Sequence, residues 1–94
     1  MRIYETIFIL KPDLPEEDAE KIITQMESVV TSTGGTLRKT DRMGKRRLAY
    51  LIRRYREGQY VLLNLTLPPT QTAPLDRNLR FLEPVMRYML TLVD

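Results

Sequence analysis

Hydrophobic periodicity changes along this 94-residue chain in an order that limits its fold more than any other feature. Residues 3–10 alternate β-branched and aromatic side chains as strands do, whereas apolar residues between 19 and 30 recur at helical steps of three and four. Strand patterns return over 36–52 and 60–67, a second, shorter helical stripe follows, and residues 85–93 form a last strand pattern. The predicted order of elements is therefore βαββαβ.

The first helix carries recognisable signals at both of its ends. Asp13 followed three residues later by Glu16 is a variant of the capping box, and it predicts a helix that begins near Leu14. Acidic residues in the first turn suit the positive end of the helix dipole. Gly34-Gly35 then predicts the end of the helix, because glycine accepts the left-handed conformation of a C-cap.

Glycine and proline also limit the later elements. Gly44 predicts a bend or bulge within the long basic strand over 36–52, and the polar segment 53–58 is predicted to be a turn. Pro74 suits the first turn of the second helix, and Pro84 forces that helix to end before it.

This order, without a repeat or a linker, predicts one α+β domain over residues 1–94 with a ferredoxin-like fold. Its four-stranded antiparallel sheet would carry both helices on one face and leave the other face bare. The side chains predicted to face the helices are Tyr4, Thr6, Phe8, Leu10, Val61, Leu63, Leu65, Tyr88 and Leu90. Those predicted to face away from them are Ile3, Ile7, Ile9, Tyr60, Leu62, Met89 and Val93.

The predicted bare face is strongly apolar, and a contiguous apolar patch of this kind usually marks an interface. The plainer interpretation is that single exposed apolar side chains are ordinary, since apolar atoms contribute much of any protein surface. The interface interpretation is favoured here, because the apolar residues gather on one face.

Charge is segregated along the chain. The segment from Arg38 to Arg56 contains nine basic residues and one acidic residue, Asp41, so its net charge is +8. The segment 13–27 carries a net charge of −5. Arginine suits phosphate because its planar fork binds two oxygens at once. Basic residues also protect an exposed sheet edge from pairing with other chains, but +8 exceeds that need. The basic segment therefore predicts RNA binding.

The composition removes most catalytic and metal chemistry. The chain contains no cysteine and no histidine, so thiolate ligands and the commonest general base are absent. The carboxylates near the start of the first helix are explained by the helix dipole. We therefore expect no enzyme activity, cofactor, metal or small-molecule substrate. No apolar run is long enough to cross a membrane and no secretory signal is recognisable, so a cytoplasmic protein without a membrane partner is expected.

Three motifs resemble one known family. They are Arg2-x-Tyr4-Glu5, the basic segment Gly44-Lys45-Arg46-Arg47-Leu48-Ala49-Tyr50, and Gly58-x-Tyr60. Together they are similar to the bacterial small-subunit ribosomal protein six family, over residues 1–93. Leu51 departs from the family, which typically has proline after Leu-Ala-Tyr.

The resemblance implies a structural constituent of the small ribosomal subunit, in a bacterial ribosome of the cytoplasm or, as the alternative, an organellar one. It also implies binding to the central domain of small-subunit rRNA beside ribosomal protein eighteen of that subunit. The residues expected to bind RNA are Arg2, Lys45, Arg46, Arg47, Arg53 and Arg87. The matched motifs supply Arg2, Arg46 and Arg47, whereas Arg87 is added by the strand pattern alone. The residues expected to face the partner protein are Ile3, Ile7, Ile9, Tyr50, Tyr60, Leu62 and Met89.

Two alternatives remain open at the level of sequence. A free-standing module for single-stranded RNA, with the topology of an RNA-recognition motif, would stack bases on strand aromatics. The segment 56–61 loosely resembles part of that motif, but Leu62 stands where a second outward aromatic is needed. A small enzyme or ligand sensor on the same scaffold would need convergent polar groups, and the sequence offers none.

Overall fold

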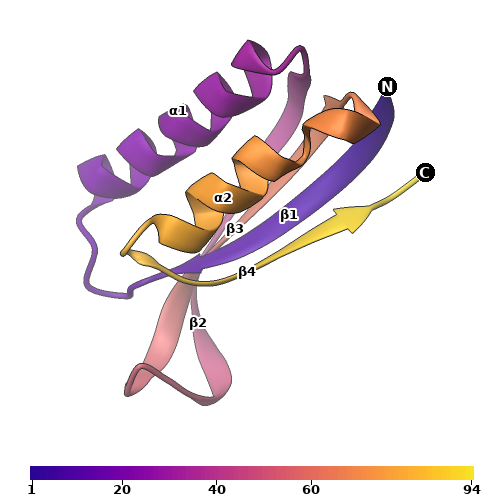
Figure 1. Ribbon diagram of the computed structural model, residues 1–94. Coiled ribbons are helices and arrows are strands. Elements are labelled where there is room, and N and C mark those ends of the chain that lie inside the picture. Colours follow the sequence, from indigo (N-terminus) through magenta and orange to yellow (C-terminus); the bar gives the residue numbers. More distant parts are fainter.

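The computed structural model describes residues 1–94 and has the predicted order of elements (Figure 1). The elements are β1 (Arg2–Leu10), α1 (Glu16–Ser32), β2 (Thr36–Ile52), β3 (Tyr55–Leu67), a 3-10 turn (Pro69–Gln71), α2 (Ala73–Phe81) and β4 (Val85–Leu92). No helix among them combines the length and the apolar character needed to cross a membrane.

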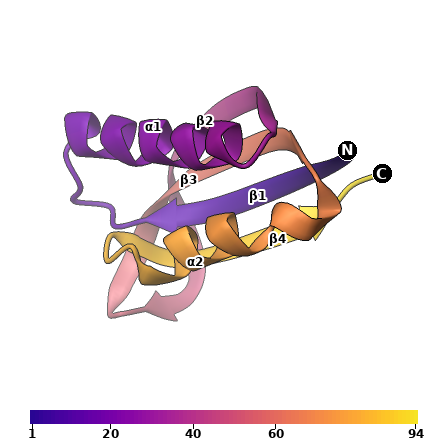
Figure 2. The ribbon, with the colours of Figure 1, turned by 45° about the horizontal axis from the view of Figure 1, so that its top comes forward.

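The four strands form one antiparallel sheet in the order β2-β3-β1-β4. The strands β2 and β4 are therefore the edges, and β1 lies between β3 and β4. Figures 1 and 2 show α1 and α2 side by side on one face of this sheet, with both termini at the same end of the molecule. The predicted ferredoxin-like fold, including its uncovered face, is confirmed.

The strand register determines which side chains share a face, because residues directly opposite each other point the same way. Phe8 lies opposite Val61 on β3 and Tyr88 on β4, all on the helix side. Ile7 lies opposite Leu62 and Met89 on the other side. The alternation predicted for the central strands is thus confirmed.

The core lies between the sheet and the two helices. Its buried apolar residues are Phe8, Leu10, Ala19, Ile22, Ile23, Met26, Val30, Val61, Leu63, Leu65, Leu67, Leu75, Leu79 and Val85. Tyr4, Tyr88 and Leu90 pack against this cluster while remaining partly exposed. Thr6 is also fully buried, as its place on the inward face of β1 requires.

The predicted start of α1 is wrong by two residues, and Asp13 does not cap it. The helix begins at Glu16, its N-cap is Pro15 in an extended conformation, and no side chain caps it. Because a residue before proline is disfavoured in the helical region, Leu14 is a poor helical residue. The carbonyl oxygen of Pro15 instead accepts backbone hydrogen bonds from Asp18 and Ala19, both at 3.0 Å.

The predicted end of α1 is confirmed. Gly34 adopts a φ of 89°, and the Gly35 amide donates to the Val30 carbonyl at 2.9 Å. The Gly34 amide donates to the Thr31 carbonyl at 3.1 Å, which completes the bond pattern of a Schellman motif. The predicted limits of α2 also hold, since Pro74 lies in its first turn and the helix ends at Phe81.

The hairpin of β2 and β3 is longer and tighter than predicted. Gly44 has a φ of 76° beside a register shift, so the predicted bulge is confirmed. The predicted turn over 53–58 is wrong, because only Arg53 and Arg54 form it, with φ values of 50° and 70°. Two successive positive φ angles give the tight turn that matches strand twist, and β3 therefore already begins at Tyr55. The last strand ends at Leu92, one residue before its predicted end.

Candidate nucleic-acid and protein interfaces

The uncovered face of the sheet carries a continuous apolar strip across β3, β1 and β4. One row joins Leu62, Ile7 and Met89, and the next joins Tyr60 and Ile9 to Arg87. We call Ile7, Ile9, Tyr60, Leu62 and Met89 the open-face patch. Ile7 and Met89 are 36% and 64% exposed, which is high for large apolar side chains. Five of the residues predicted to face a partner are thus brought together.

Ile3 lies on the same face but is separated from the open-face patch by a polar row. In that row the Asn64 amide donates a 3.3 Å hydrogen bond to the carboxylate of Glu5. Ile3 itself lies opposite Thr66, one row further on. The structure therefore places Ile3 at the margin of the predicted partner face.

Tyr50 reaches the open face by a different route. Although β2 and β4 are opposite edges of the sheet, the Arg87 guanidinium carbon lies 5.4 Å from the centre of the Tyr50 ring, a cation–π distance. Figure 1 shows how this happens, since the far end of the β2–β3 hairpin extends past β1 and the start of β4. A groove of about 300 Å³ lies there, lined by Ile7, Ile9, Tyr50, Arg87, Tyr88 and Met89.

Three of the predicted RNA-binding residues stand side by side on the edge strand β2. Lys45, Arg46 and Arg47 lie opposite Gln59, Gly58 and Glu57. All three cations are exposed and none forms an ion pair. Because strand residues alternate, Arg46 points to the open face while Lys45 and Arg47 point to the helix side. We call Lys45, Arg46 and Arg47 the β2 cation cluster.

Arg53 and Arg2 occupy quite different surroundings. The Arg53 guanidinium donates to the backbone carbonyls of Glu83 and Val85, at 2.7 and 3.1 Å. Arg2 hydrogen-bonds to Asp94 at the opposite end of β1, at 3.0 Å to its backbone oxygen and 3.4 Å to its carboxylate. At about 3.3 Å per strand residue, that end lies roughly 26 Å from the β2 cation cluster. The six predicted RNA-binding residues therefore do not form one patch.

Arg42 shows where the basic and acidic segments meet. Its guanidinium hydrogen-bonds to the carboxylates of Glu16 and Glu20 on α1, the latter at 2.6 Å. These hydrogen bonds raise the pKa of Arg42 above its ordinary value. The sequence does not reveal this contact, because it depends on α1 crossing over β2. The charge of Arg42 is thus neutralised within the fold, whereas the β2 cation cluster has no acidic partner and stays exposed.

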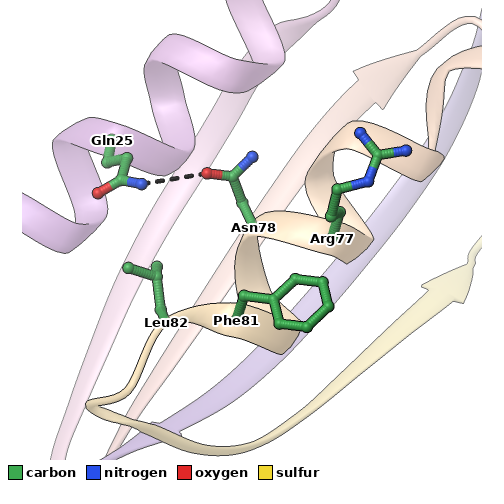
Figure 3. Close-up of a pocket in the computed structure, with 5 residues that line it drawn as sticks. All are labelled: Gln25, Arg77, Asn78, Phe81 and Leu82. Atoms are coloured by element: carbon green, nitrogen blue, oxygen red, sulfur yellow. Dashed lines mark hydrogen bonds between the residues drawn. The ribbon is translucent and has the colours of Figure 1, made fainter.

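A second hollow, of about 330 Å³, lies between the two helices and is lined by Gln25, Arg77, Asn78, Phe81 and Leu82. Figure 3 shows the Gln25 amide of α1 donating to the Asn78 side-chain oxygen of α2, a bond of 3.1 Å. Its lining offers no carboxylate, and no cluster of possible metal ligands occurs in the molecule. The hollow therefore lacks the groups of a general acid–base or metal site.

Comparison with known proteins reveals one family. Residues 3–91 match the family model described as Ribosomal protein S6. The chain is 45% identical over 93 residues to small ribosomal subunit protein bS6 of Acidobacterium capsulatum, covering 99% of this chain and 66% of that relative. It is 44% identical over 91 residues to the bS6 protein of Exiguobacterium sibiricum, covering 97% of this chain and 96% of that relative.

Solved structures agree with the sequence comparison. The crystal structure of 30S ribosomal protein S6 from Thermotoga maritima matches with a TM-score of 0.93 and 28% identity, over 98% of this chain and 87% of that one. A chemotaxis kinase CheA P2 domain, in complex with CheY, matches with a TM-score of 0.61 but only 14% identity. That second likeness shows a shared fold and nothing more.

Proposed function

The chain belongs to the ribosomal protein S6 family and is a structural protein of the small ribosomal subunit; we propose that it works there as an adaptor between RNA and protein. In this proposal, the β2 cation cluster binds the central domain of small-subunit rRNA, and the open-face patch packs against ribosomal protein eighteen. A location in the cytoplasmic ribosome agrees with its bacterial relatives, which are small ribosomal subunit proteins.

The observation that carries the RNA half of the proposal is the β2 cation cluster itself. Three consecutive cations protrude from an edge strand without any acidic partner, whereas Arg42 on the same strand is paired. Unpaired cations at an exposed edge attract phosphates and release counterions when they bind. Arginine adds a fork that holds two phosphate oxygens, so Arg46 and Arg47 are the principal candidates.

The open-face patch carries the protein half of the proposal. Large apolar side chains occupy adjacent rows on three strands, and covering them removes apolar area from water. A contiguous patch of this kind is the usual mark of a protein interface. The family resemblance of the sequence implies ribosomal protein eighteen as a neighbour, and in this proposal that protein covers the patch.

The two surfaces adjoin each other, which suggests how assembly is coordinated. Arg46 lies opposite Gly58, two residues from Tyr60 along β3, and both Arg46 and Tyr60 point to the open face. Two strand residues span about 7 Å, so a bound partner protein and a bound RNA backbone would meet at this boundary. Each partner then adds contacts for the other, and no bond chemistry is involved.

A free-standing module for single-stranded RNA remains the second candidate. It would need several aromatic rings exposed on the open face of the central strands. Tyr60 alone occupies such a position, and it is half-buried between Leu62 and Ile9. The residues on these strands therefore favour an adaptor over a base-stacking platform.

The test is binding of the purified protein to a central-domain rRNA fragment, with and without ribosomal protein eighteen, across a salt series. If four to six phosphates are contacted, the log–log slope of affinity against salt is about −3 to −5. We expect tight, salt-sensitive binding that requires the partner protein. Binding to short single strands without the partner would favour the second candidate, and a flat salt slope would refute the RNA half.

A further inference from the structure

We infer that the groove between Tyr50 and Arg87 on the open face is a preformed subsite for one large apolar side chain of the partner protein. A carboxylate of that partner would pair with Arg87. This inference rests on the proposed function, because it specifies the chemistry that the open face recognises. It also assigns Arg53 as the residue that holds the groove in shape.

The floor of the groove selects an apolar occupant. Ile7, Ile9 and Met89 supply aliphatic surface, and the groove volume of about 300 Å³ is at the lower end of ligand pockets, roughly 300–1,000 Å³. The only phenol besides Tyr50 is that of Tyr88, whose hydroxyl already donates to Asp76 at 2.8 Å. An RNA base would leave its polar edge unmatched over this floor, so an apolar protein side chain is the better occupant.

The charge of the groove wall indicates which residue of the partner lies beside the apolar side chain. Arg87 is the only charged residue of the lining, it is exposed, and it forms no ion pair. Its guanidinium lies over the Tyr50 ring, which leaves its edge free to donate hydrogen bonds. A carboxylate accepts two such bonds at once, so an acidic residue beside the apolar anchor fits this wall.

The wall formed by Tyr50 depends on how the hairpin is held. Arg53 stands in the hairpin turn and donates to the backbone carbonyls of Glu83, which precedes β4, and of Val85, the first residue of β4. The loop that contains Glu83 is itself fixed, since the Glu83 carboxylate forms an ion pair with Lys11. These contacts tie the end of the hairpin to the start of β4, where Arg87 begins the other wall. A groove that is already built avoids the entropy cost of forming it upon binding.

Arg53 is therefore a positioning residue for the partner site, which differs from the role of phosphate ligand predicted from the sequence. The matched control is Arg54, its neighbour in the turn, which also has a positive φ but makes no side-chain hydrogen bond or ion pair. Both arginines are exposed and carry the same charge. A difference between their variants therefore reports on the contacts that Arg53 makes with Glu83 and Val85.

The experiment measures the dissociation constant for ribosomal protein eighteen by calorimetry, without RNA, after circular dichroism has shown that each variant is folded. We expect Tyr50→Ala, Arg87→Glu and Arg53→Ala to weaken binding about tenfold or more, as truncated anchors do. Arg87→Lys should lose less affinity than Arg87→Glu, because lysine keeps the positive charge but cannot bind both carboxylate oxygens at once, and Arg54→Ala should stay within about twofold. In the Tyr50→Ala background, Arg53→Ala should have no further effect, because its role is to place Tyr50.

Other results would overturn the inference. Wild-type affinity in Tyr50→Ala and Arg87→Glu would show that the partner avoids the groove, while the proposed function would stand. Full additivity of Tyr50→Ala and Arg53→Ala would show that Arg53 does not act by placing Tyr50. A salt slope for RNA that is shallower by about 0.7 to 0.9 in Arg53→Ala would identify a phosphate ligand instead. If the wild-type protein fails to bind ribosomal protein eighteen, both the proposed function and the subsite are wrong.

Discussion

Thr6 is a polar residue in the centre of the sheet whose hydroxyl has no hydrogen-bond partner. The residue is fully buried on the inward face of β1. A buried hydroxyl without a partner costs about 1–3 kcal/mol of desolvation, and valine has nearly the same shape without that group. We expect Thr6→Val to raise the free energy of unfolding by about 1 kcal/mol in urea denaturation. Thr66→Val, a half-exposed control, should change it by less than about 0.5 kcal/mol, and a destabilised Thr6→Val would contradict the account.

The ion pair between Glu83 and Lys11 should make the stability of the fold depend on pH. The hydrogen bond and ion pair with Lys11 hold the pKa of the Glu83 carboxyl below its ordinary value of 4.5. Because the folded-state pKa is lowered, the pair stabilises the fold fully above pH 4.5, and this stabilisation is lost as pH falls through the lowered pKa. In a carboxyl NMR titration, we expect the Glu83 midpoint to rise in Lys11→Met. An unchanged midpoint would mean that the ion pair does not form in solution.

The roles of single residues could be predicted from the sequence less well than the order of the helices and strands. The cations of the β2 cation cluster could be singled out because they lie in a recognisable motif. The role of Arg53 could not, because the carbonyls that it binds come from 30 and 32 residues further along the chain. A basic side chain looks the same in sequence whether it contacts a phosphate or its own backbone.

At the scale of elements, Gly58 is required where the hairpin crosses β1. A Cβ atom at this position would lie 2.2 Å from Cγ2 of Ile9 and 3.1 Å from Cε of Met86. We expect Gly58→Ala to lower the free energy of unfolding by about 1–3 kcal/mol, as overpacking does. Because Ile9→Ala removes the clashing methyl group, the double variant should cost less than the sum of the two single variants in urea unfolding. Simple additivity would show that the clash is relieved elsewhere.

The order and faces of the elements could be predicted because periodicity reports directly on which side chains are buried. The ends of the elements were predicted less accurately than their order, since two backbone effects outweighed local propensity. Pro15 disfavours a helical Leu14, so the apparent capping box of Asp13 goes unused. Two arginines adopt positive φ in the hairpin turn, although glycine or asparagine is the usual signal for such a turn. No sequence pattern indicated that turn.

At the scale of the whole molecule, charge and apolar surface are arranged on different elements. The acidic start of α1 neutralises Arg42 on the helix side, while the β2 cation cluster extends beyond that contact. The open-face patch lies beside the cluster on the uncovered side of the sheet. Sequence could predict both surfaces separately, but their adjacency at Arg46 and Tyr60 follows only from the register of β2 and β3. In the proposed function, this adjacency is the physical basis for joint binding of RNA and protein.

The central claim is that RNA is bound by the β2 cation cluster while the partner protein is bound elsewhere. The most direct test is the salt dependence of affinity for the central-domain rRNA, with ribosomal protein eighteen bound, for wild type and the triple variant Lys45→Gln, Arg46→Gln, Arg47→Gln. We predict a log–log slope that is shallower by about 2 to 3 in the variant, at about 0.7 to 0.9 per lost phosphate contact, with affinity for the partner alone within about twofold of wild type. An unchanged slope would contradict the account.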